Sequence, residues 1–378
     1  MSPSLRIAIV GPSHPYTGGI ASHTTTLARR LQQEGHRLRL ISWRAQYPRF
    51  LRNGQLRVPD GEPETVVFDD VEEPLTWYNP LTWFSVGRSL RTYDLVIVTA
   101  VTPYHAVPFM ALRTGMGKRV PAVVLAHNVL PHESGRFDRA LSRWLYRGYG
   151  AVMTHSHEQA ELAAAIAPGV AVSSARLPLP DLRFGPDSSV STTSLRARAR
   201  TEGAPVTVLF FGMVRPYKGL DILLHAMAEV PDMRLVVAGE FWEGHDDYIR
   251  LVESLGIADR VELRDRYVPM SEVPALFQAV DALVLPYRSG TATVNVALAF
   301  LFGLPVIASD AGSMHLDIDD GVDGFVVPRD DVDALAQALS SLRDPEVLAS
   351  LSAGVSRTRH ADQWADYVAT ITRLASRP

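Results

Sequence analysis

The chain has 378 residues, of which 47% are hydrophobic, and a formal net charge of −4. This length exceeds the roughly 250–300 residues that one hydrophobic core usually supports, so we expect two domains. The near-neutral charge excludes a nucleic-acid binder held by a basic face, and the absence of cysteine excludes disulfides, thiolate catalysis and cysteine metal ligands.

No targeting or membrane-spanning segment is expected. The N-terminal residues lack a charged leader before a long apolar run. No segment reaches the roughly 18 uncharged apolar residues that a spanning helix needs. These features predict a cytoplasmic protein.

The first half of the chain alternates short apolar runs with helical patterns. An apolar run over 5–11 leads into a loop that contains Gly18 and Gly19, and a helical pattern follows over 21–35. Glycines at such a junction allow positive φ and close approach of a ligand to the backbone, although a plain tight turn has the same composition. Further runs of Val, Ile and Leu show little polar alternation, as expected of parallel strands covered on both faces. They occupy 36–42, 93–100, 122–127 and 150–156.

The segment TWYNPLTWF at 76–84 is dense in aromatic residues and lies in a weakly patterned insertion. One interpretation is a packed flap. The other is a platform that includes Trp77 and Trp83 and binds an apolar or sugar acceptor, or a contact with a membrane surface. The segment RAQYPRF at 44–50 is open to the same interpretations.

The second half repeats the scheme of the first after an aperiodic stretch. Residues 181–204 combine Pro, Ser, Thr and charge without periodicity and are the expected linker. Alternating strands and helices on both sides of it predict two doubly wound domains, 1–180 and 205–360. A helix within 361–378 is expected to pack back toward the first domain. The strands expected in the second domain occupy 206–212, 233–239, 260–265, 281–286 and 304–310.

Two cations follow the first strand of the second domain. The apolar run 208–211 breaks at Gly212, and Arg215 and Lys218 precede a helical pattern that resumes at Leu220. Backbone N–H groups at a helix start and two long cations suit a diphosphate, because the helix dipole and the side chains favour the same charge. A solvated loop with idle basic residues is the alternative. A Walker loop is excluded, because the Gly-Lys-Ser/Thr ending is missing.

His127 ends the apolar run 122–127. Ligands of open α/β sheets bind at the carboxyl ends of the strands, so a histidine at this position faces the ligand edge. A histidine of the core would more often lie in the middle of a strand.

These motifs occur in the order found in retaining glycosyltransferases of family 4, and the chain resembles that family over nearly its whole length. The N-terminal segment YTGGIASHTTTLARRLQQEGHRLRLIS resembles the acceptor half of the family. The Lys-Gly motif, VVAGE, RVEL, DALVLPYRSG, ALAFLFGLPVIASDAGS and DGVDGFVVP resemble the nucleotide-sugar half. The resemblance implies an α/β protein with two doubly wound, Rossmann-like domains that face a central cleft, the GT-B fold.

The resemblance also implies roles for the motif residues. Lys218 and Arg215 would hold the pyrophosphate of the donor, although the family's arginine usually follows the glycine directly. Gly18 and Gly19 would close over the donor phosphates. His127 would be the catalytic residue near the transferred sugar, where it polarises the sugar or aids proton movement rather than attacks.

The chain departs from the family at the Glu-x7-Glu motif. Alignment on the Gly-Leu-Pro sequence at 303–305 places Gly290 and Leu298 at the two glutamate positions. Neighbouring polar residues are candidates for the lost donor contacts, unless they merely cap a helix that starts near Thr293. The donor-binding candidates of this segment are Ser289, Gly290, Thr291, Thr293 and Asn295.

The resemblance implies transfer of a sugar from a nucleoside diphosphate sugar to an acceptor, with retention of configuration and without a metal or further cofactor. The acceptor would be a saccharide, a lipid-linked or a small molecule, and peripheral contact with a membrane surface is compatible with it. A catalytically silent nucleotide-sugar-binding subunit is a rival, because both glutamates are missing. A nucleotide-sugar epimerase of the same fold is a second rival.

Overall fold

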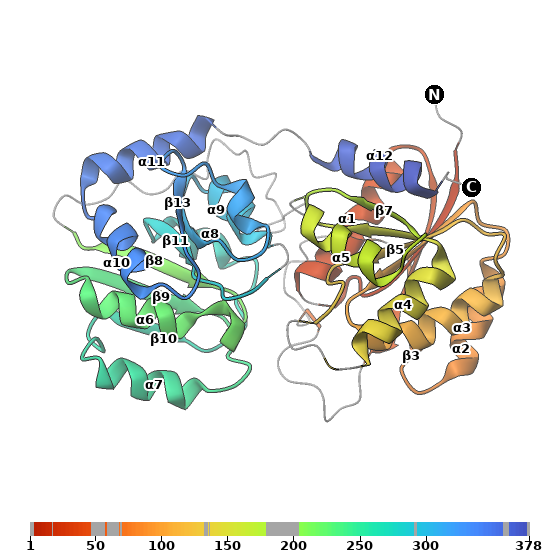
Figure 1. Cartoon of the computed structure of the whole chain (residues 1–378), viewed down its shortest axis with the longest axis horizontal. Helices are drawn as coiled ribbons and strands as arrows, with labels where there is room; N and C mark the ends of the chain where they lie inside the picture. Colours follow the sequence, from red (N-terminus) through yellow and green to blue (C-terminus); the bar gives the residue numbers. More distant parts are fainter. Residues whose placement is uncertain are drawn as a thin grey trace. The chain divides into compact units, whose positions relative to one another are not determined.

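In the computed structural model, the chain folds into two compact units (Figure 1). The first comprises Met1–Asp60, Thr65–Leu182 and Asp362–Pro378, and the second comprises Gly61–Glu64 and Arg183–Ala361. The structure describes residues 4–16, 18–46, 57–58, 68, 70–131, 135, 137–178, 204–290, 293–357 and 363–375. Most of the expected linker, 181–204, therefore lies outside the described residues.

The first unit contains a seven-stranded parallel sheet in the order β3-β2-β1-β4-β5-β6-β7. Its central strands are buried along their whole length, as their uninterrupted apolar sequences require. The strands are β1 (Arg6–Val10), β2 (Arg37–Ala45), β3 (Val71–Thr76), β4 (Leu95–Ala100), β5 (Ala122–Ala126), β6 (Ala151–Thr154) and β7 (Ala171–Ser174).

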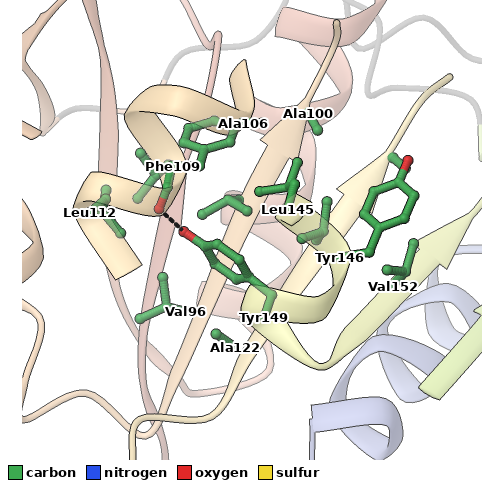
Figure 2. Close-up of a cluster of buried hydrophobic side chains, with 14 of the residues drawn as sticks. Val96, Ala100, Ala106, Phe109, Leu112, Ala122, Leu145, Tyr146, Tyr149 and Val152 are labelled. Carbon is green, nitrogen blue, oxygen red and sulfur yellow. Dashed lines mark hydrogen bonds between the residues drawn. The ribbon is translucent and has the colours of Figure 1, made fainter. Parts of the chain in front are cut away.

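Helices cover both faces of this sheet. One face packs against α2 (Pro80–Ser89), α3 (Ala106–Met116), α4 (Asp138–Tyr149) and α5 (His157–Ile166). Figure 2 shows this core, in which the hydroxyl of Tyr149 donates a 2.8 Å hydrogen bond to the carbonyl of Phe109 on the neighbouring helix. A buried phenol needs such a partner, so the bond fixes α4 beside α3.

The opposite face packs against α1 (Gly19–Gln33) and α12 (Gln363–Ala375). The apolar residues of α12, which include Tyr367 and Ile371, lie against β5, β6 and β7. The last helix of the chain is thus part of the core of the first unit.

The second unit contains a six-stranded parallel sheet in the order β10-β9-β8-β11-β12-β13. The strands are β8 (Val206–Phe211), β9 (Met233–Ala238), β10 (Val261–Arg264), β11 (Ala282–Leu285), β12 (Val306–Ser309) and β13 (Gly324–Val327). The helices are α6 (Leu220–Glu229), α7 (His245–Ser254), α8 (Val273–Gln278), α9 (Asn295–Leu301), α10 (Val332–Ser341) and α11 (Pro345–Arg357), with 3-10 turns η3 (Pro216–Lys218) and η4 (Met314–Asp317).

The two sheets confirm the predicted class of two doubly wound, Rossmann-like domains. The expected strands appear with ends shifted by a few residues, and the structure adds the edge strands β3, β7 and β13. The segment 76–84 contains the end of β3 and the first turns of α2. Asn79 caps that helix by accepting a 3.1 Å hydrogen bond from the backbone N–H of Leu81.

Candidate functional site

The backbone geometry of the loop after β8 determines the position of Lys218. Gly212 follows the strand with φ of 97°, and the turn η3 ends at Lys218. Gly219 then adopts φ of 68° before α6 begins, and a Cβ at this position would lie 2.1 Å from the carbonyl oxygen of Pro286. Only glycine fits such a close approach, so the Lys-Gly pair is a geometric requirement of this turn.

The ammonium group of Lys218 lies close to the end of the strand. A Cβ added to Gly212 would be 3.5 Å from Nζ of Lys218 and 3.8 Å from Nδ2 of Asn295. Nζ also lies 5.4 Å from the ring centroid of Tyr287. Burial, and then repulsion from Arg215, lowers the pKa of Lys218 to about 8. At neutral pH the side chain is still charged.

Neither cation of this loop is paired with a carboxylate in the described part of the chain. The guanidinium of Arg215 instead lies 4.5 Å from the ring centroid of Trp242. Other arginines of the same unit do pair with Asp or Glu, namely Arg250, Arg264, Arg266, Arg288, Arg329 and Arg343. The carboxyl edge of β8 therefore carries two uncompensated positive charges, which suits an anionic ligand.

Asn295, the first residue of α9, contacts the end of β8 beside the same loop. Its Nδ2 donates a 3.2 Å hydrogen bond to the carbonyl of Phe211, and its backbone N–H donates to the hydroxyl of Thr293 at 3.2 Å. Thr293 thus supports the start of the helix. Ser289 and Gly290 precede this point on the loop after β11, whereas Thr291 lies outside the described residues.

The two positions of the missing glutamates differ in environment. Leu298 is 4% exposed and packs in the core of the second unit. Gly290 has no positive φ, and a Cβ there would make an ordinary 3.5 Å contact with the ring of Tyr287. A side chain is therefore tolerated at position 290, whereas a carboxylate at position 298 would be buried among apolar groups.

His127 lies one residue beyond β5 and is 7% exposed. Its Nδ1 is 3.1 Å from Nε2 of His155, which follows β6 in the same way. His23 of α1 completes a cluster, with ring centroids 5.2 Å from His127 and 5.5 Å from His155. Trp364 and Tyr367 of α12 cover His23 at centroid distances of 5.2 and 5.1 Å.

Burial keeps these three histidines neutral. It lowers the pKa of His127 to about 3, and burial together with repulsion from His127 lowers the pKa of His23 and of His155 well below the ordinary value. Nε2 of His127, Nδ1 of His155 and both ring nitrogens of His23 have no hydrogen-bond partner in the described part of the structure. The sequence patterns did not single out His23 or His155, although the position of His155 at a strand end is the signal that identified His127.

Gly18 and Gly19 lie at the start of α1, and Gly18 has φ of 98°. A Cβ added to either glycine would meet no atom within 4 Å, so the space beside the turn is open. Among the described residues no side chain caps this end of α1, and no acidic residue lies in its first turn. The first N–H groups of the helix are therefore available to an anion.

The two tryptophans of the aromatic segment have different environments. Trp77 is 43% exposed, whereas Trp83 is 7% exposed and donates a 2.7 Å hydrogen bond from Nε1 to the carbonyl of Thr76. Trp83 is therefore a core residue of α2 and is removed from the expected acceptor platform.

Within the described residues, no group of three or more His, Asp or Glu side chains is arranged to hold a metal ion. None of the helices in this described part of the chain has the length and apolar character needed to cross a membrane.

The two doubly wound, Rossmann-like units place the protein in a class of fold, the GT-B fold. The sucrose-phosphate synthase from Thermosynechococcus elongatus superposes with a TM-score of 0.74 at 15% identity, covering 98% of both chains. HepE from Anabaena in complex with UDP superposes with a TM-score of 0.72 at 16% identity, covering 98% of this chain and all of that one. Identities this low establish the fold alone.

Two family models assign the chain more narrowly. The model described as Glycosyltransferase Family 4 matches residues 17–169, and the model described as Glycosyl transferases group 1 matches residues 205–344. Together they match most of the chain, which is a family 4-like glycosyltransferase.

The curated relatives agree with this assignment. The D-inositol 3-phosphate glycosyltransferase of Mycolicibacterium smegmatis is 32% identical over 207 residues, which are 51% of this chain and 46% of that protein. The enzyme of the same name from Mycobacterium marinum is 32% identical over 169 residues, 42% of this chain and 35% of that protein. The chain thus spans less than half the length of these relatives.

Proposed function

We propose that the protein transfers a sugar from a nucleoside diphosphate sugar to an acceptor, with retention of configuration. The observation that carries this proposal is the pair of cations at the carboxyl end of β8, Lys218 and Arg215, neither of which pairs with a carboxylate among the described residues. A glycosyl donor leaves a diphosphate when its sugar is transferred. Cations placed in advance on that leaving group stabilise the charge that develops as the glycosidic bond breaks.

The two cations have different assigned roles. Nζ of Lys218 lies beside Gly212, where the missing Cβ leaves room for a phosphate oxygen close to the backbone. The guanidinium of Arg215 lies over the ring of Trp242. It is a planar group whose N–H donors match two phosphate oxygens. Gly18 and Gly19 are assigned to the donor phosphates as well, through the uncapped start of α1.

His127 remains the candidate for the catalytic residue. A pKa lowered to about 3 makes it a neutral imidazole throughout the physiological range, so it acts by hydrogen bonding through Nε2 to a sugar hydroxyl and not as an imidazolium acid. Asn295 is assigned to the donor in place of the missing glutamates, because it lies beside Gly212 and Lys218.

The first ligands to test follow from the related proteins. HepE has been crystallised with UDP and with UDP-glucose, and the curated relatives are named for D-inositol 3-phosphate. UDP-sugars are therefore the first donors, and inositol phosphates, saccharides and lipid-linked sugars are the acceptor panel. We place the protein in the cytoplasm, with Trp77 as the exposed residue that would contact an acceptor or a membrane surface.

The decisive experiment measures binding and turnover in the same preparation. Calorimetry with UDP, GDP and ADP identifies the base, and Lys218→Ala should weaken the preferred diphosphate by roughly 10- to 100-fold, the value of one charge-assisted contact. Lys118→Ala, which removes an exposed lysine of the first unit, is the matched control. Unchanged diphosphate affinity in Lys218→Ala would refute the assigned site.

Turnover then identifies the reaction. Release of UDP from the donor should require an acceptor, and the anomeric configuration of the product, read by NMR, should match that of the donor. Tight nucleotide binding without turnover over the whole acceptor panel would contradict the proposed transfer.

A further inference from the structure

Arg288, three residues beyond the end of β11, joins three segments at the carboxyl edge of the second sheet. Its Nη1 and Nη2 donate to the two carboxylate oxygens of Asp221 at 2.7 and 2.6 Å. Its Nε donates to Asp330 at 2.8 Å, and Nη1 also donates to the carbonyl of Pro216 at 3.0 Å. The partners belong to the first turn of α6, the loop after β13 and the turn η3.

This guanidinium is engaged by the protein itself. Four hydrogen bonds use most of its five N–H groups, and two carboxylates balance its charge. Burial alone would raise the pKa of Asp221, but the hydrogen bonds from Arg288 hold that pKa below its ordinary value. Arg288 therefore differs from Lys218 and Arg215, which have no carboxylate partner in the described part of the unit.

The contacts of Arg288 lead directly to Lys218. The side chain binds the carbonyl of Pro216, and the backbone N–H donates a 2.8 Å hydrogen bond to the carbonyl of Tyr217. These are the two residues before Lys218 in η3. The residue after it, Gly219, packs against the carbonyl of Pro286. Residues 286–288 thus determine the position of the turn that carries the lysine.

Asp330 has φ of 60°, a left-handed backbone conformation that Asp and Asn adopt more readily than most residues other than glycine. Its carboxylate is one of the two that Arg288 engages.

We propose that Arg288 is a positioning residue for donor binding, which holds η3 so that Nζ of Lys218 lies beside Gly212 before the diphosphate arrives. The inference rests on the proposed role of Lys218. Arg288 itself does not touch the ligand. The benefit is preorganisation, because a lysine on an unrestrained turn would lose more conformational freedom when it binds.

The test is a double-mutant cycle read by calorimetry with UDP, or with whichever diphosphate binds most tightly. Arg288→Gln should weaken binding by roughly tenfold, and Arg288→Lys should not restore it, because an ammonium group cannot make the forked contact with Asp221. In the Lys218→Ala background, Arg288→Gln should weaken binding by less than about twofold, since its effect passes through the lysine.

Arg264→Gln is the matched control. Arg264 makes a similar forked pair with Glu262, at 2.7 and 3.0 Å, and is 38% exposed against 35% for Arg288, but it does not contact η3. The diphosphate affinity of Arg264→Gln should equal that of the unmodified protein. Asp330→Asn, which removes one contact and leaves the fork to Asp221, provides a milder variant if Arg288→Gln fails to fold, and it should weaken binding by a smaller factor.

Two results would overturn the inference. One is a diphosphate affinity of Arg288→Gln, or of Asp330→Asn when Arg288→Gln does not fold, within experimental error of the unmodified protein. The other is an undiminished loss from Arg288→Gln in the Lys218→Ala background, which would mean that the guanidinium leaves Asp221 and binds the phosphates directly. If Lys218→Ala alone leaves the affinity unchanged, the proposed function of the site is wrong, and that result is distinct from both.

Discussion

Lys218 carries a charge that the described part of the second unit does not balance. Burial lowers the pKa of the ammonium group, because the charged form is less favourable here than in water. Such a site costs stability in the free protein. Binding of a diphosphate removes that cost, because it provides the missing opposite charge.

The lowered pKa of Lys218, about 8, predicts opposite pH trends for binding and stability. UDP affinity should fall as pH rises from 7 through about 8 to 9, because the free lysine loses its proton. The free energy of unfolding gains a contribution with rising pH between about 8 and the ordinary lysine value of 10.5, because the unfolded chain then binds more protons than the folded one. Calorimetry and denaturation across this range check both trends, and Lys218→Met should abolish both.

His127 should matter for turnover and not for nucleotide affinity. His127→Gln keeps a hydrogen-bonding group but changes its position, so we expect the rate of transfer to fall by roughly 2- to 10-fold, the value of one neutral hydrogen bond to the sugar. UDP affinity should stay within about twofold, because the side chain is assigned to the sugar. Steady-state kinetics and calorimetry separate the two quantities.

His157 provides the comparison for His127. It is exposed on α5, where it pairs with Glu161 one turn away, so His157→Gln should leave both quantities unchanged. Full activity in His127→Gln would assign His127 to packing.

Asn295 and Leu298 test how the chain compensates for the missing glutamates. Asn295→Ala removes a neutral hydrogen bond to the end of β8 and an amide beside Lys218, and should weaken donor binding by about 0.5–1.5 kcal/mol. Leu298→Glu should not improve transfer, because the carboxylate would be buried among apolar side chains, and should lower the melting temperature. Calorimetry and thermal denaturation measure these effects. Tighter donor binding by Leu298→Glu would contradict this account.

At the scale of elements, α1 and α12 enclose the three histidines beside the ends of β5 and β6. An unpartnered ring nitrogen in the interior can accept a proton only at the cost of burying a charge. The packing of α12 therefore depends on all three rings being neutral.

This cluster predicts acid lability of the first unit. Burial lowers the pKa of each histidine, so the unfolded chain binds protons that the folded one does not as pH falls below about 6.5. The free energy of unfolding should therefore fall between pH 7 and 5. His23→Leu should reduce that slope by up to about 1.4 kcal/mol per pH unit, the value for one titrating group. Denaturation at several pH values measures it, and an unchanged slope would refute the role of His23.

Substitution of the two tryptophans near α2 should separate a role in core packing from a role at the surface. Trp83→Ala removes a buried ring and its hydrogen bond and should lower the free energy of unfolding by about 3–5 kcal/mol. Trp77→Ala should change it by no more than about 0.5 kcal/mol, because that ring is largely exposed. Chemical denaturation checks stability. If Trp77 contacts the acceptor, its removal raises the Michaelis constant of the acceptor and not that of the donor.

For the whole molecule, local patterns predicted the repeated strand-helix alternation because buried parallel strands have continuous apolar sequences. They did not predict β3, whose sequence includes two glutamates and a proline, or β7, which is half-buried at the edge of its sheet. Edge strands carry weaker apolar signals than central ones. The basic loop was identifiable because Gly212 and the Lys-Gly pair have geometric roles that follow from residue type.

The parts of the site that sequence reasoning missed depend on contacts between distant residues. Arg288 lies 67 positions from Asp221 and 42 from Asp330, and no local period connects them. His23 meets His127 and His155 only because α1 covers the sheet beside two strand ends. Trp83 lies six positions after Trp77, but the turn before α2 directs the two rings to different environments.

The position of α12 in the core of the first unit has a consequence for synthesis on the ribosome. All of β8 through α11 is translated before this helix emerges. All helices and strands of the second unit are made before α12, whereas the first unit lacks its last helix until then, with the ends of β5 and β6 uncovered. The half of the molecule that is made first is therefore the half that matures last, and a chain truncated after residue 357 should bind UDP but be cut by protease in its N-terminal half.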